Sequence, residues 1–217
     1  QVCTDALQDI NRSMRKNKRI APDRELVYVE SGTKDADRYL AQMRCASNFA
    51  YNNRHIIMNW IRESFNEVLG IPKEDLELVY GICHNILKQE EHDVGGGKKK
   101  KVNVHRKGAT RAFPPNHPDL PQEYRSIGQP VLIPGTMGTA SYLCVGQDNA
   151  MDLSFGSTAH GGGRAMIRYK AKRKFWGEDI KKQLNKRGIA IRADSMRIVA
   201  EEAPLAYKNI EDVVNVS

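Results

Sequence analysis

The feature that most restricts how this chain can fold is a glycine-rich stretch at residues 154–164, SFGSTAHGGGR. It sets His160 directly before three consecutive glycines and then Arg164. Glycines permit positive φ angles and let the backbone approach a ligand closely. Successive N–H groups in such a turn form an anion site, and a guanidinium matches the geometry of phosphate. A histidine held there can attack phosphorus. The stretch therefore indicates nucleotide or phosphoryl chemistry, with a solvated turn as an equal alternative on these residues alone.

Positive charge is concentrated after this stretch. The 217-residue chain has 34 Lys and Arg against 26 Asp and Glu, a formal net charge of +8. Residues 164–192 contain eleven Lys and Arg opposed only by Glu178 and Asp179, so that this segment holds +9 and the rest of the chain is close to neutral. A localised basic segment is typical of a surface that binds a polyanion such as RNA.

Cysteine spacing and hydropathy bear on the cellular compartment. Cys3, Cys45, Cys83 and Cys144 are widely separated, and no CxxC pair is present. This spacing argues against a structural zinc site and favours reduced thiols in a cytoplasmic protein. We find no signal peptide and no apolar run long enough to cross a bilayer, so no membrane partner is expected. The chain starts without Met and stops abruptly, and we expect a piece of a longer protein.

Hydrophobic periodicity predicts a mixture of helices and short strands. Helices are expected over residues 4–17 with Thr4 as N-cap, 34–69 with a break near Asn52 and Asn53, 164–174, 177–187 and 210–214. Strands are expected over residues 25–30, 76–79, 131–134, 140–145 and 189–193, with a hairpin around the glycines at 95–97. The apolar residues of 34–69 are expected to pack in a core. Because strands and helices do not alternate regularly, the pattern favours the α+β class.

Several polar clusters in the second half carry a resemblance to a known family. They read CHN at 83–85, VHRKGATRAFPP at 104–115, GQPVLIPGTMGTASY at 128–142, EEAP at 201–204 and AYKN at 206–209, together with the stretch around His160. Over essentially the whole chain these runs resemble the RtcB-type RNA-splicing ligase family. The resemblance implies that family's mixed sheet and helix fold, incomplete on the N-terminal side and at the extreme C-terminus. Residues 1–217 would form the C-terminal portion of a single ligase catalytic domain.

The resemblance also implies a reaction and its partners. Members of the family join an RNA 3′-phosphate or 2′,3′-cyclic phosphate end to a 5′-hydroxyl end, with GTP and Mn²⁺. A histidine takes GMP covalently from GTP, GMP passes to the RNA 3′-phosphate, and the 5′-hydroxyl then displaces it. The implied substrates are tRNA halves or broken RNA ends, and archease is the implied activator protein.

Roles for particular residues follow from the matching motifs. His160 matches the guanylylated, catalytic histidine, and His84 matches a ligand of Mn²⁺, which accepts imidazole. Nucleotide contacts are implied for Asn85, Pro134, Gly135, Thr136, Met137, Ser141, His160, Gly161, Gly162, Gly163 and Tyr207. RNA contacts are implied for Arg164 and Arg168, which we expect on one face of one helix, four residues apart. Arg106, Lys107 and Arg111 are expected to extend this surface.

The sequence also departs from the family's pattern. The family builds its metal site from an aspartate, a cysteine and three histidines, and by motif only His84 has a counterpart here. We therefore expect the isolated chain to be inactive in ligation. Gly162 stands where alanine is usual, and Ile167 stands where serine is usual.

Two further functions remain open from the residues. One is a non-catalytic RNA-binding module that uses the basic segment 164–192. The other is a metal-dependent phosphohydrolase or another nucleotidyltransferase. Hydrolases of the common classes need clustered acids, and the loops near His84, His105 and His160 contain few. Nucleotidyl transfer is therefore favoured.

Overall fold

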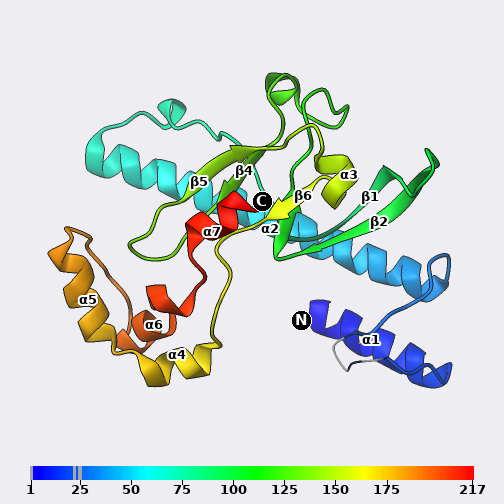
Figure 1. Cartoon of the computed structure of the whole chain (residues 1–217), viewed down its shortest axis with the longest axis horizontal. Helices are drawn as coiled ribbons and strands as arrows, with labels where there is room; N and C mark the ends of the chain where they lie inside the picture. Colours follow the sequence, from blue (N-terminus) through cyan, green and yellow to red (C-terminus); the bar gives the residue numbers. More distant parts are fainter. Residues whose placement is uncertain (1, 22, 24–25) are drawn as a thin grey trace. The chain divides into compact units, whose positions relative to one another are not determined.

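We analysed the chain in a computed structural model that describes residues 2–21, 23 and 26–217 (Figure 1). The chain divides into two compact units, residues 1–79 and residues 80–217, which are treated separately below. The expectation that both belong to one catalytic domain stays a prediction. The strand expected at 25–30 begins outside the described residues, and residues 26–30 form no strand.

Among its described residues, the first unit has two helices and a short 3-10 turn. They are α1 (Val2–Lys16), α2 (Lys34–Leu69) and η1 (Lys73–Asp75). Ile10 and Met14 lie buried along one face of α1, as the periodicity predicts, but Leu7, expected on the same face, is exposed and Ala6 is buried instead. The expected N-cap is wrong, because α1 begins at Val2 and Thr4 lies inside it.

Helix α2 is continuous, so the predicted break near Asn52 and Asn53 is wrong. It contains neither Pro nor Gly, and an interior Asn weakens a helix by less than about 1 kcal/mol. Thr33 caps its start by accepting from the Ala36 N–H at 3.2 Å, and Gly70 ends it with a φ of 67°. Its large apolar side chains are mostly exposed, so the predicted core along α2 is also wrong.

The second unit contains three two-stranded antiparallel pairs. β1 (Asn85–Asp93) pairs with β2 (Lys99–Lys107), β3 (Ala109–Arg111) with β6 (Ser157–Ala159), and β4 (Pro130–Ile133) with β5 (Tyr142–Val145). The predicted hairpin is confirmed: the glycines at 95–97 have positive φ, and the Val94 N–H donates to the Lys98 carbonyl at 3.0 Å. The predicted strands at 131–134 and 140–145 correspond to β4 and β5.

Five helices and two 3-10 turns complete the second unit. They are η2 (Gln122–Tyr124), α3 (Ala150–Ser154), α4 (Arg168–Lys174), α5 (Gly177–Lys186), α6 (Met196–Glu201), η3 (Pro204–Ala206) and α7 (Ile210–Asn215). The helices predicted at 177–187 and 210–214 are confirmed. The strands predicted at 76–79 and 189–193 are absent, since no strand pairs with either segment. Without a neighbouring strand, the backbone N–H and C=O groups of an extended segment have no sheet hydrogen bonds to form.

Two clusters of buried side chains hold this unit together. One joins α4, α5 and α6 through Ala171, Leu184 and Val199, and the other packs α7 against the β4–β5 pair. Mixed helices and small sheets are compatible with the predicted α+β class. Cys45, Cys83 and Cys144 form no disulfide. Within the described part of the chain, every helix is too short or too polar to cross a membrane.

Candidate functional site

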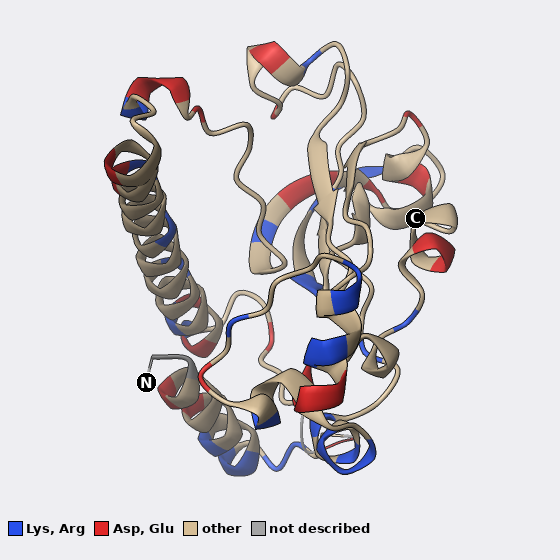
Figure 2. Cartoon of the chain, turned by 90° about the vertical axis from the view of Figure 1, so that its left-hand side faces the viewer, with Lys and Arg blue, Asp and Glu red and all other residues tan. Residues whose placement is uncertain are grey.

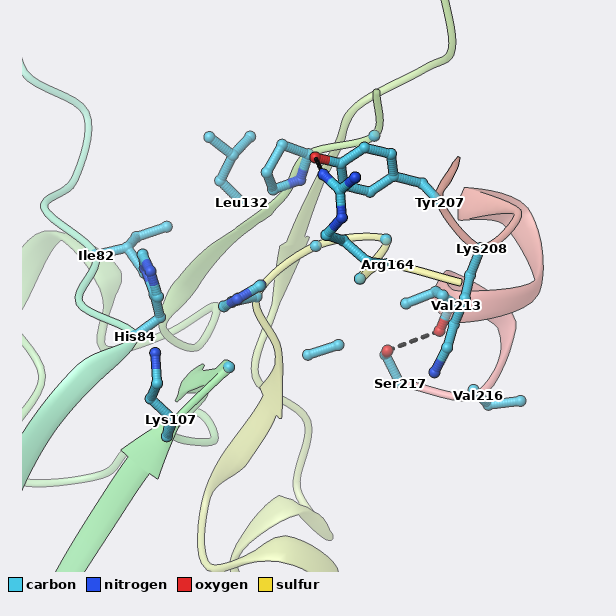
Figure 3. A pocket seen from close by; sticks show the side chains of 18 of the residues that line it. Ile82, His84, Lys107, Leu132, Arg164, Tyr207, Lys208, Val213, Val216 and Ser217 are labelled. Carbon is cyan, nitrogen blue, oxygen red and sulfur yellow. Dashed lines mark hydrogen bonds between the residues drawn. The ribbon is translucent and has the colours of Figure 1, made fainter. Parts of the chain in front are cut away.

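An open cavity of about 1090 Å³ lies in the second unit and gathers most of the predicted site residues (Figure 3). Its lining includes His84, Pro134, Gly135, His160, Gly161, Gly162, Gly163, Arg164, Arg168 and Tyr207. These residues come from four separate stretches of the sequence. The volume slightly exceeds the usual range of about 300–1,000 Å³ for ligand sites, so a nucleotide is not too large for it.

His84 and His160 meet because two strand pairs end at the same place. His84 precedes β1, and its carbonyl accepts the Gly108 N–H at 3.1 Å. Ala109, the next residue, pairs with Ala159 at the end of β6. The two imidazole rings consequently lie edge to face, with centroids 4.6 Å apart and an interplanar angle of 79°.

The electrostatics of this corner favour a neutral His84. Burial lowers the pKa of His84, and the neighbouring His160 and Lys107 lower it further. A neutral imidazole is the form that can bind a metal ion. Gly108 has a φ of +71°, and a Cβ there would lie 3.8 Å from His160 Nε2, so the backbone passes close to the imidazole.

The glycine loop is clamped on both sides by main-chain hydrogen bonds. The Gly162 N–H donates to the Pro134 carbonyl at 3.1 Å, and the Gly163 carbonyl accepts the Lys208 N–H at 3.0 Å. A Cβ at Gly161 would lie 3.0 Å from the Pro134 carbonyl oxygen. At Gly162 the nearest atom would be 3.5 Å away, an ordinary contact. The first glycine is therefore needed for the close approach, and the second is not.

Arg164 does not share a helix with Arg168, contrary to the prediction. Arg164 forms an isolated β-bridge with Tyr207, and α4 begins only at Arg168. The reason is that the N–H groups of Ala165 and Met166 both donate to the Ala206 carbonyl, which draws the chain away from a helical path.

The Arg164 side chain is held by several protein groups. It donates to the carbonyls of Met166 and Glu201 at 3.0 and 2.6 Å, and to Glu202 Oε2 and the Tyr207 hydroxyl at 3.1 and 2.9 Å. The guanidinium also lies over the Tyr207 ring, 4.8 Å from its centroid. Arg164 thus fixes one wall of the cavity.

Arg168 and Tyr207 differ in how far they are available to a ligand. The Arg168 side chain is 68% exposed, with Nε 3.1 Å from Glu201 Oε1. The Tyr207 hydroxyl bonds to Glu202, and burial together with this carboxylate raises the pKa of Tyr207. Arg168 is the more accessible of the two predicted RNA-binding arginines.

Four predicted nucleotide contacts lie outside the cavity lining: Asn85, Thr136, Met137 and Ser141. Thr136 belongs to a turn in which its N–H donates to Thr139 Oγ1 at 2.7 Å, and Met137 packs against the α4–α6 cluster. Their roles stay predictions.

Two lysines also line the cavity, and Figure 3 shows them on its opposite sides. Lys107 was expected to extend the surface of Arg164 and Arg168, whereas Lys208 was given no role from the sequence. Lys208 follows Tyr207 within the AYKN run, and this run was the sequence signal that could have placed Lys208 at the cavity. Arg106, by contrast, does not extend the surface as predicted: it is 3% exposed and turns inward to bind Glu90. Arg111 lies over the Phe113 ring.

The described residues do not form a complete metal site. No group of three or more His, Cys, Asp or Glu among them is arranged to hold a metal ion. His84 faces His160, and no Asp or Glu of the described part lines the cavity. One imidazole falls short of the ligand set that Mn²⁺ takes.

Comparison with known proteins agrees with the resemblance noted in the sequence. Residues 1–217 match the family model described as tRNA-splicing ligase RtcB. The tRNA-splicing ligase RtcB of Pyrococcus abyssi is 54% identical over 218 residues, which cover 100% of this chain and 24% of that protein. The corresponding protein of Thermococcus kodakarensis is 51% identical over 218 residues, covering 100% and 45%. The chain thus spans less than half the length of these relatives.

Proposed function

The chain belongs to the RtcB family of tRNA-splicing ligases, and from this membership and the cavity we propose that it carries the nucleotidyl-transfer centre of an RNA ligase. The observation that carries the proposal is the position of His160. It lies between a glycine loop and cationic side chains in a cavity that no carboxylate of the described residues lines. Such surroundings suit a nucleophile that attacks a polyphosphate better than they suit a carboxylate-dependent hydrolase.

In the proposed first step, a nitrogen of the His160 imidazole attacks the α-phosphorus of GTP. A nitrogen–phosphorus bond forms, the bond to the pyrophosphate oxygen breaks, and pyrophosphate leaves with its electron pair. The glycine loop leaves room for the phosphates, and its backbone N–H groups suit their charge. Lys107, Lys208 and Arg168 supply positive charge around the cavity, which would stabilise the transition state.

In the next steps GMP moves onto the RNA. An oxygen of the RNA 3′-phosphate attacks the GMP phosphorus and the bond to His160 breaks. The 5′-hydroxyl of the second RNA end then attacks the activated 3′-phosphate, loses its proton and expels GMP. A 2′,3′-cyclic phosphate is first hydrolysed: a water oxygen bonds to phosphorus, the bond to the 2′-oxygen breaks, and that oxygen takes up a proton to leave the 3′-phosphate. The proposed substrates are tRNA halves or broken RNA ends in the cytoplasm, with archease as activator.

Nucleotide contacts divide into two groups by position. Pro134, Gly135 and Tyr207 line the cavity with His160, so they are the first candidates for contacts with guanosine. Asn85, Thr136, Met137 and Ser141 would contribute only if the turn after Pro134 or the start of β1 moved toward the nucleotide. His84 is the one candidate ligand for Mn²⁺ among the described residues that line the cavity.

The first test asks whether His160 accepts GMP. The chain is incubated with α-labelled GTP and Mn²⁺ and then separated under denaturing conditions, alongside His160→Ala and, as matched control, His55→Ala on α2. A label that is acid-labile, base-stable and lost only in His160→Ala supports the proposal. Labelling that survives His160→Ala contradicts the assignment of the nucleophile.

A second test supplies the metal ligands that the described residues lack, so that the activity of the His160 site can be measured. In a chimera, this chain replaces the 218 matched residues of the Thermococcus kodakarensis relative. We expect the chimera to guanylylate itself and to join cyclic-phosphate RNA to 5′-hydroxyl RNA, whereas the isolated chain joins none. A folded chimera without either activity, beside an active parent, would refute the proposed function.

A second candidate function is RNA binding without catalysis. It is favoured by the exposed basic residues of α4 and α5, which Figure 2 shows as blue ribbon. This function predicts salt-dependent RNA binding that His160→Ala leaves unchanged, together with an inactive chimera. The two tests above separate it from the ligase.

A further inference from the structure

A second hollow in this unit combines aromatic and basic side chains. It measures about 420 Å³ and lies over α4, the start of α5 and α6. Its lining includes Tyr169, Phe175 and Trp176 together with Lys172, Arg173 and Arg197. The side chains that bind GTP in the proposed function do not line it. Its chemistry is therefore not explained by nucleotidyl transfer.

Two of the aromatic rings are strongly exposed. Tyr169 is 65% and Trp176 is 74% accessible to solvent. The Arg173 guanidinium lies over the Tyr169 ring, 5.6 Å from its centroid, and donates to the Tyr169 hydroxyl at 3.5 Å. Exposed aromatic side chains that line one hollow mark a binding surface more often than a single exposed apolar residue does.

The exposure of Trp176 is built into the fold. The next residue, Gly177, packs so closely on α6 that a Cβ would lie 2.0 Å from the Met196 carbonyl oxygen. This contact fixes the start of α5, and Trp176 precedes it in extended conformation, with φ −107° and ψ 126°. Trp176 is thus anchored by its neighbour while its indole remains in solvent.

The charge around these rings is positive on balance, because Lys172, Arg173 and Arg197 line the hollow against one acidic residue, Glu178. Lys172 pairs with Glu201 at 2.8 Å, but within the described part of the chain Lys170, Arg173 and Lys174 make no ion pair. Basic side chains that alternate with exposed rings suit single-stranded nucleic acid, because the phosphates meet the cations and the bases stack on the rings. Neither an acidic peptide nor a membrane offers a series of flat faces to stack.

We propose that Tyr169 and Trp176 form a stacking platform for unpaired bases of the RNA strand whose terminal phosphate enters the His160 cavity. Arg168 lines that cavity and is the first residue of α4. The seven residues of α4 span about 10 Å at the usual helical rise. The platform therefore lies within reach of the nucleotides next to the reacting end. This inference rests on the RNA substrate of the proposed function.

The test measures binding of a fluorescent, single-stranded RNA of about ten nucleotides with a 3′-phosphate. We expect Trp176→Ala and Tyr169→Ala each to weaken binding about tenfold, and Trp176→Phe to retain most of it, because a phenyl ring still stacks. In a Trp60→Phe background, which leaves Trp176 as the single tryptophan, the RNA should quench its fluorescence.

Salt dependence distinguishes stacking from charge. Trp176→Ala should leave the slope of log affinity against log salt unchanged, whereas Arg173→Ala should reduce it by about 0.7 for a single strand. Trp60→Ala, which removes an exposed tryptophan of α2, is the matched control and should bind normally. Circular dichroism confirms that each variant is folded.

Each remaining outcome has a definite meaning. If Trp176→Ala binds RNA as the unchanged chain does, the platform is refuted, while guanylylation of His160 can still succeed. If polyglutamate binds in a Trp176-dependent way and RNA does not, the surface serves an acidic protein partner instead. If RNA does not bind at all while His160 is labelled by GTP, the platform fails and the nucleotidyl-transfer centre stands.

Discussion

Arg106 and Glu90 form a doubly hydrogen-bonded ion pair in the interior of the second unit, with nitrogen–oxygen distances of 2.8 and 2.9 Å. Arg106 also donates to Ser157 Oγ and to the Phe155 carbonyl, each at 2.9 Å. The pair therefore ties the β1–β2 hairpin to the residues that lead into β6, and β6 ends directly before His160.

Glu90→Gln should destabilise the protein by about 3–5 kcal/mol, because the buried Arg106 charge would lose its counter-charge. The matched control is the neighbouring Glu91→Gln. Glu91 pairs with Lys99 at 3.8 Å, and both side chains are mostly exposed. Loss of the Glu91 charge should therefore change the free energy of unfolding by less than about 1 kcal/mol. Urea unfolding followed by circular dichroism measures both, and equal effects would show that the interior pair is not special.

The same carboxylate should shape the stability at acid pH. Burial raises the pKa of Glu90, but hydrogen bonds from Arg106 and His92 and the charge of Arg106 outweigh it, so that the pKa lies below its ordinary value. The stabilising effect is then fully present above the ordinary pKa of about 4.5 and is lost as the pH falls through the folded-state pKa.

Unfolding free energies measured from pH 6 down to about pH 3 should fall more steeply for the unchanged chain than for Glu90→Gln, which has no group to titrate there. Glu91→Gln again serves as control and should keep the steep slope. Parallel curves for Glu90→Gln and the unchanged chain would mean that Glu90 has a similar pKa in the folded and unfolded states.

Local turn and cap chemistry explains which parts of the fold the sequence predicts well. The hairpin follows from three adjacent glycines with positive φ, and the end of α2 follows from Gly70. The glycine loop and its histidine line a cavity, at the place where the residue types predict a site. In each case a few neighbouring residues decide the conformation, so no knowledge of distant contacts is required.

Long-range pairing explains what the sequence does not predict. β3 and β6 are 3 residues each and stand far apart in the sequence, so neither shows a periodicity. The inward turn of Arg106 depends on Glu90 from the opposite strand, and the departure of Arg164 from a helix depends on the Ala206 carbonyl. The meeting of His84 and His160 depends on the β1–β2 and β3–β6 pairings.

Two glycines near His160 should differ in how much a substitution by alanine destabilises the protein. At Gly156 the φ is +58°, and a Cβ would lie 2.5 Å from Phe113 Cδ1, so Gly156→Ala should cost about 2–4 kcal/mol through overpacking and backbone strain. At Gly162 the nearest atom would be 3.5 Å away, so Gly162→Ala should change stability by less than about 0.5 kcal/mol.

Thermal unfolding of both variants checks this contrast, and labelling by GTP should persist in Gly162→Ala. A tolerated Gly156→Ala would mean that Phe113 can move aside. A destabilised Gly162→Ala would mean that the loop is tighter than its contacts indicate.

The two arginines predicted as a pair should separate by experiment. The Arg164 side chain is 22% exposed and bonds to Glu202, to Tyr207 and to two carbonyls, so Arg164→Ala should cost about 2–4 kcal/mol of stability. Arg168 is 68% exposed, so Arg168→Ala should cost less than about 1 kcal/mol. Loss of the Arg168 side chain should instead weaken binding of a 3′-phosphorylated RNA and lower the slope of log affinity against log salt by about 0.7, because one phosphate contact is removed.

Arg44→Ala, at an exposed arginine of α2, should alter neither stability nor RNA affinity. Urea unfolding and RNA titration at several salt concentrations give both quantities for each variant. A stable Arg164→Ala with weakened RNA binding would reverse the two assignments and make Arg164, not Arg168, the residue that meets the RNA phosphate.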